Sequence, residues 1–99
     1  MGRALEYNYT TLRISRAYVS LLSRAGSDTI SLAWIGDFEI RMRAVKSDGP
    51  GEQPLFVVDI FDHDAQSFID SRPCHTLAEG ATAFEQFLFM IGPVTSGPH

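Results

Sequence analysis

The chain is organised around one apolar stretch that ends in a cluster of acids and a histidine. This stretch is LFVVDIFDHD, residues 55–64. Its first seven residues are apolar except for Asp59, which is typical of a strand covered on both faces. Aspartates favour turns because their side chains bond the local backbone. We therefore expect a central strand over residues 55–61 that ends in a polar turn at Asp62, His63 and Asp64.

Two runs of alternating polarity precede this strand. In residues 29–35, Ile30, Leu32 and Trp34 are predicted to point to one side of a strand. Residues 38–46 alternate in the same way, and Gly36 and Asp37 between the runs indicate a tight β-hairpin turn. Residues 47–54 contain two glycines and two prolines and are predicted to form a loop. After the central strand, residues 66–70 are expected to return as a fourth strand, followed by a proline-containing loop at residues 71–75.

Helical spacing marks both ends of the chain. Residues 12–25 lack glycine and proline and are predicted to form a helix that ends at Gly26. A strand over residues 12–22 is the alternative, because β-branched and aromatic residues are frequent there. Thr76 and Glu79 have the spacing of a capping box, which predicts a second helix that stops at Gly92. The apolar faces of the two helices are expected to contain Ile14, Tyr18, Leu21, Leu22 and Ala25 in the first, and Leu77, Ala81, Phe84, Phe87, Leu88 and Ile91 in the second.

These elements define one α+β domain over residues 1–99. The links between strands are short, which requires antiparallel neighbours. We predict an antiparallel four-stranded β-meander flanked by an N-terminal and a C-terminal α-helix. Residues 1–9 are expected to form a loose arm and residues 94–99 a frayed tail.

Composition narrows the setting and the partners. Cys74 is the single cysteine, so no intrachain disulfide can form and a cytoplasmic location is expected. No apolar run approaches the ~18–20 residues of a membrane span, so no membrane association is expected. The net charge of −4 and pI of about 5.1 argue against a nucleic-acid partner.

The candidate chemical residues follow the central strand. Asp62, His63, Asp64, Cys74 and His75 are the candidate ligand-binding residues, because such side chains bind metals or transfer protons. Their spacing matches no metal or nucleophile motif, so neither a metal site nor a cofactor is predicted. The simplest interpretation is a solvated turn and a loop thiol.

Three functions from different classes are compatible with the sequence. The preferred one is a small cytoplasmic interaction or regulatory module without chemistry of its own. The alternatives are an enzyme that uses the Asp/His cluster at residues 59–75 for metal or acid–base chemistry, and a small-molecule binder with a pocket between sheet and helices. Surplus apolar side chains predict a homodimer or another protein partner. The expected interface residues are Leu12, Val19, Phe89 and Met90.

Overall fold

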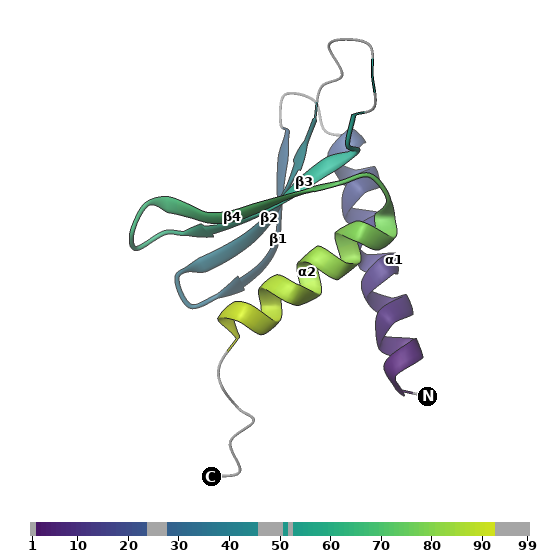
Figure 1. The fold of residues 1–99 in the computed structure, drawn as a ribbon, viewed down its shortest axis with the longest axis horizontal. Helices are drawn as coiled ribbons and strands as arrows, with labels where there is room; N and C mark the ends of the chain where they lie inside the picture. Colours follow the sequence, from purple (N-terminus) through teal and green to yellow (C-terminus); the bar gives the residue numbers. More distant parts are fainter. Residues whose placement is uncertain (1, 24–27, 46–50, 52, 93–99) are drawn as a thin grey trace.

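A computed structural model gives the fold, and it describes residues 2–23, 28–45, 51 and 53–92, with side chains from residue 9 onward (Figure 1). Helix α1 precedes four strands and helix α2 follows them, which confirms the predicted α+β architecture. The bounds are α1 Gly2–Ser23, β1 Thr29–Ile35, β2 Phe38–Ala44, β3 Phe56–Asp62, β4 Ser67–Cys74 and α2 Leu77–Ile91.

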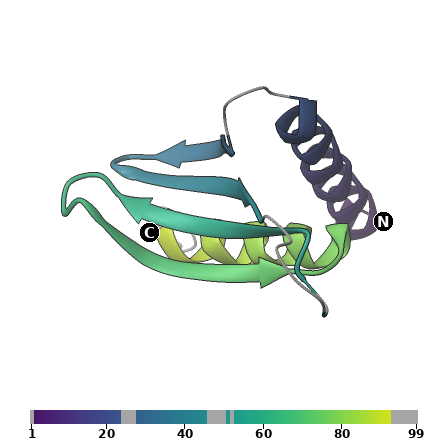
Figure 2. The ribbon, with the colours of Figure 1, turned by 90° about the horizontal axis from the view of Figure 1, so that it is seen from above.

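The sheet is an antiparallel meander in the order β1-β2-β3-β4. Ile40 pairs with Ile60 and Met42 with Val58, so these four fully buried side chains lie on one face of β2 and β3. Both helices pack against this face. In Figure 2, which looks onto the sheet from the other side, α2 lies behind the strands. The opposite face has no helix over it among the described residues.

Helix α1 is longer than predicted. The prediction of a loose arm at residues 1–9 is wrong from Gly2 onward. The backbone is helical from Gly2, because nothing between residues 3 and 23 interrupts a helix: the segment contains no glycine or proline. Thr10 lies inside α1 and donates a hydrogen bond from Oγ1 to Glu85 Oε2 of α2 at 2.8 Å. Leu22 was predicted on the packed face but is 64% exposed. The predicted roles of Ala25, Gly26 and residues 94–99 lie outside the described residues.

Strand β4 is also longer than predicted. The prediction of a loop at residues 71–75 is wrong for most of these residues, which belong to the strand. The strand continues through Pro73, which pairs with Val57, to Cys74. A proline is tolerated here because β4 is an edge strand, where one side of the backbone has no neighbour that requires an N–H donor. By contrast, β2 ends at Ala44, two residues before the predicted end.

Helix α2 begins and ends where the sequence predicted. Thr76 caps it, with its Oγ1 accepting a hydrogen bond from the Glu79 backbone N–H at 3.0 Å. Glu79 completes the cap by accepting from the N–H of His75, one residue before the position expected for a capping box. Neither helix, in the described part of the chain, is long and apolar enough to cross a membrane.

Candidate functional site

A β-bulge in β1 turns Trp34 onto the uncovered face of the sheet. The register shifts between Ser31 and Ala33, which leaves Leu32 without a Cα partner on β2. The extra residue shifts the side-chain alternation by one position. Leu32 therefore stays in the core, whereas Trp34 points to the other face and is 55% exposed. The prediction that Trp34 points the same way as Leu32 is wrong for this reason.

The other edge strand has a matching bulge. Ile60 pairs with Asp70 but the next residue, Phe61, pairs with Phe68, so Ile69 has no Cα partner on β3. Phe68 is thereby placed beside Phe61 on the uncovered face and is 54% exposed. Each edge strand thus uses one extra residue to present one large aromatic side chain on this face.

These two residues complete a row that crosses all four strands. Trp34 pairs with Glu39, Glu39 with Phe61, and Phe61 with Phe68, so the four side chains lie side by side on the same face. We call these four residues, together with His63, the aromatic row. The His63 ring stacks on Trp34 at a centroid distance of 4.5 Å and meets Phe61 edge-on at 4.7 Å. Phe61 in turn meets Phe68 edge-on at 4.9 Å, so the rings form one continuous chain.

Two buried carboxylates lie on this helix-free face. Asp59 is 1% exposed and accepts a hydrogen bond from Arg43 Nε at 3.0 Å. That hydrogen bond raises the pKa of the Arg43 guanidinium above its usual value. Glu39 is 7% exposed, and its Oε1 lies 2.8 Å from His63 Nε2. Burying a carboxylate has a large desolvation cost, which the two basic partners offset.

Arg41 lies over the aromatic row and leaves one polar group unsatisfied. Its guanidinium lies 4.7 Å from the ring centre of Phe61 and 5.0 Å from that of Phe68. Such cation–π contacts hold the guanidinium beside the two rings. Its Nε is buried without a hydrogen-bond partner and lies 4.0 Å from Glu39 Oε1.

The structure separates the five predicted ligand-binding residues into two groups. Asp62, His63 and Asp64 lie where β3 ends, whereas Cys74 pairs with Phe56 at the other end of that strand. Six residues of strand span about 20 Å. Asp62 Oδ1 accepts hydrogen bonds from the backbone N–H groups of Asp64 and Ala65, as in the predicted turn. The described residues contain no group of three or more His, Cys, Asp or Glu side chains that could hold a metal ion.

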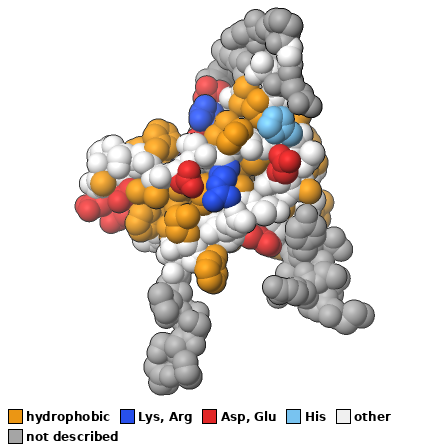
Figure 3. Space-filling model, viewed as in Figure 1, with side chains coloured by type: hydrophobic (Ala, Val, Ile, Leu, Met, Phe, Trp, Pro, Cys, Tyr) orange, Lys and Arg blue, Asp and Glu red, His pale blue; other side chains and the backbone are white. Residues whose placement is uncertain are grey.

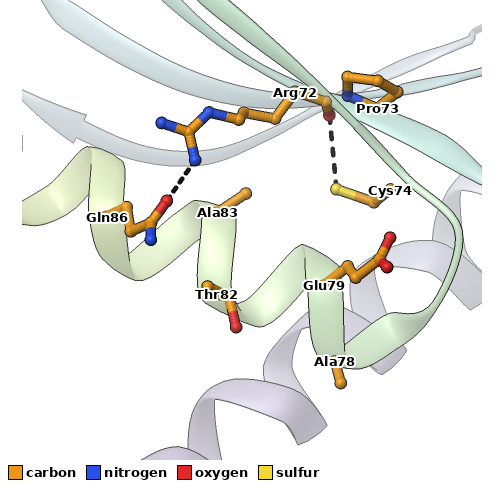
Figure 4. Close-up of a pocket in the computed structure, with 8 residues that line it drawn as sticks. All are labelled: Arg72, Pro73, Cys74, Ala78, Glu79, Thr82, Ala83 and Gln86. Carbon is orange, nitrogen blue, oxygen red and sulfur yellow. Dashed lines mark hydrogen bonds between the residues drawn. The ribbon is translucent and has the colours of Figure 1, made fainter.

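Cys74 lies at the floor of an open groove of about 350 Å³ between β4 and α2 (Figure 4). Arg72 and Gln86 form a hydrogen bond across this groove. The thiol is 1% exposed, and burial, followed by the charge of Glu79, raises its pKa to about 11. A thiol with this pKa is protonated at neutral pH and is a poor nucleophile.

A second hollow of about 420 Å³ lies at the hairpin ends, between Ile35, Phe38 and Ile91, with Asp37, Asp62 and Asp64 at its rim. Figure 3 shows acidic side chains gathered at this end of the molecule. The two hairpins are joined there by a hydrogen bond from the His63 N–H to the Asp37 carbonyl at 2.9 Å.

The predicted interface residues are exposed as expected. Leu12 and Val19 lie on α1, and Phe89 and Met90 on α2, where Phe89 is 92% exposed. Their role in an interface stays a prediction.

Comparison with protein-family models, curated proteins and solved structures finds no match to this chain.

Proposed function

We propose that this protein is a small cytoplasmic interaction module that binds another protein through the uncovered face of its sheet. The observation that carries this proposal is the aromatic row. Two bulges place Trp34 and Phe68 in solvent although the sheet has a packed face that could have taken them. Exposed aromatic side chains with an arginine beside them are typical of the centre of a protein interface.

The charges on the face favour a protein over a nucleic acid. Arg43 is paired with Asp59, and the Arg41 guanidinium contacts two phenylalanine rings. Neither guanidinium is free to neutralise a phosphate without losing these contacts. The chain as a whole carries −4, which repels a polyanion.

Enzymatic function has less support. An acid–base or metal site requires its groups within a few ångströms of one another. Here the turn residues and the Cys74–His75 pair lie at opposite ends of β3. The buried Cys74 thiol adds no nucleophile.

The proposal is tested by asking whether the aromatic row is needed for folding. We expect Trp34→Ser and Phe68→Ser each to lower the unfolding free energy by at most about 1.5 kcal/mol in dilute solution, because ring–ring contacts and, for Phe68, one cation–π contact with Arg41 are lost at a half-exposed position. Phe56→Ser, in the fully buried core, is the matched control and should cost more than about 3 kcal/mol. Urea denaturation in the low-micromolar range provides the comparison. A loss of 3 kcal/mol or more for the exposed residues would assign the row to fold stability and remove the basis for a binding role.

A further inference from the structure

We propose that the partner is a second copy of this chain, docked face to face on the uncovered side of the sheet. This inference rests on the proposed function, because it names the partner of the same surface. Four observations support it: the condition of the sheet edges, the charge of the face, the arrangement of its rows and its size.

Several backbone groups on the two edge strands are unavailable for strand addition. On β4, the Ser71 N–H is bonded to the side chain of Asp70 at 2.8 Å, and Pro73 has no N–H at all. On β1, the carbonyl of the bulged Leu32 accepts a hydrogen bond from Arg13 Nη2 at 2.5 Å. These are the devices by which proteins prevent edge-to-edge pairing. A second sheet is therefore expected to associate through the face.

The uncovered face carries no net charge, unlike the chain. The two arginines Arg41 and Arg43 balance the two carboxylates Glu39 and Asp59 in formal charge, whereas the whole chain carries −4. Two copies can therefore meet through this face without a net repulsion among these arginines and carboxylates. Two copies that meet through the hairpin ends would place two sets of aspartates against each other, which costs several kcal/mol in a close interface.

The rows of the face define how the two copies match. The second row, beside the aromatic row, crosses the strands as Ser31, Arg41, Asp59 and Ser71. A two-fold axis that runs parallel to the strands, between β2 and β3, places each row opposite the same row of the second copy. Strand β1 then faces β4, and β2 faces β3. Arg41 then faces Asp59 of the second copy, and Trp34 faces Phe68.

One alternative placement of the two-fold axis is electrostatically unfavourable. With the two-fold axis perpendicular to the strands and along the second row, each residue of that row faces its own copy. Arg41 then lies against a second Arg41, and Asp59 against a second Asp59. Like charges directly opposite each other are destabilising, so the axis parallel to the strands is preferred over this placement.

The size of the face indicates a weak dimer. Strands of seven residues in a four-stranded sheet give a flat area of about 450 Å² per copy. The total of about 900 Å² is below the ~1,200 Å² of stable specific interfaces and falls in the range of weak, transient ones. We therefore expect a reversible dimer with a Kd on the order of 10 µM.

The arrangement of the strands can be tested by cross-linking. In an equimolar mixture of the Ser31→Cys and Ser71→Cys proteins, a short bis-maleimide should join one of each. Cys74 is buried and contributes little, because its thiol has a pKa of about 11. Products that join only Ser31→Cys to itself would overturn the axis parallel to the strands.

Sedimentation velocity from about 1 to about 200 µM tests the second copy itself. The wild type should change from monomer to dimer, and Trp34→Ser or Phe68→Ser should raise Kd at least about 30-fold, as loss of an aromatic anchor does. The matched control is Leu22→Ser on α1, whose side chain is 64% exposed and lies outside the predicted interface residues, and it should leave Kd unchanged; circular dichroism confirms that each variant is folded.

Two results would overturn the inference. Loss of the dimer in the α1 control but not in the face variants would assign association to the helix. A wild type that stays monomeric throughout would exclude a second copy as the partner. The denaturation test of the uncovered face would still stand, and the partner of that face would be a different protein.

Discussion

At Gly80, helix α2 lies close to Phe56 of β3, and replacing this glycine tests the packing directly. A Cβ built at this position lies 2.5 and 2.7 Å from two ring carbons of Phe56 and 3.1 Å from Ile14 Cγ2. Phe56 and Ile14 are both fully buried, so neither can move into solvent. Gly80→Ala should therefore force α2 away from β3 or push Phe56 off its rotamer. Such overpacking costs about 1–3 kcal/mol.

Helix propensity acts in the opposite direction at this position. Alanine is favoured over glycine in a helix interior by about 1 kcal/mol. The two effects together predict that Gly80→Ala lowers the unfolding free energy by up to about 2 kcal/mol. Urea denaturation of wild type and variant measures the difference, with Ala78→Gly on the exposed side of α2 as a control for propensity alone. An increase in stability of about 1 kcal/mol for Gly80→Ala would refute the close approach of α2 to Phe56.

Three further predictions concern buried groups. Phe84→Ala should cost about 3–5 kcal/mol in chemical denaturation, because Phe84 is 2% exposed at the centre of the α2 face; a loss below about 1 kcal/mol would contradict this. Arg43→Met should cost about 3–5 kcal/mol because it leaves Asp59 buried without a cation, and adding Asp59→Val should recover most of the loss. The pKa of the Cys74 thiol is raised from 9.0 to about 11, because the folded state favours the neutral thiol. Its contribution to the unfolding free energy is therefore fully present below pH 9 and is lost as the pH rises through 11. That loss amounts to about 2.7 kcal/mol and should be absent in Cys74→Ala; equal losses in both proteins would show that other groups cause it.

The strands and the second helix could be predicted because each carries its own local signal. Alternation marks β1 and β2, Gly36 takes a positive φ of 60° in the turn between them, and Thr76 and Glu79 cap α2. These signals act between near neighbours in the chain. They are therefore visible in the residue pattern without knowledge of the fold.

The candidate site could not be predicted because it depends on register. Leu32, Ala33 and Trp34 are all apolar, so nothing in their sequence reveals that a bulge moves Trp34 to the other face. Likewise, Asp62 and His63 are adjacent in the sequence but differ in environment. Asp62 bonds the backbone of its own turn, whereas His63 lies between two aromatic rings and beside Glu39.

The most direct test of the docking face uses Trp34, the single tryptophan of the chain. Its emission and its quenching by acrylamide should be measured across the concentration range in which sedimentation detects the dimer. We predict that emission moves to shorter wavelengths and that quenching decreases as the dimer forms, because the ring passes from solvent into the interface. Trp34 emission and quenching that stay constant while the mass doubles would show that the copies associate elsewhere and would contradict the proposed face-to-face dimer.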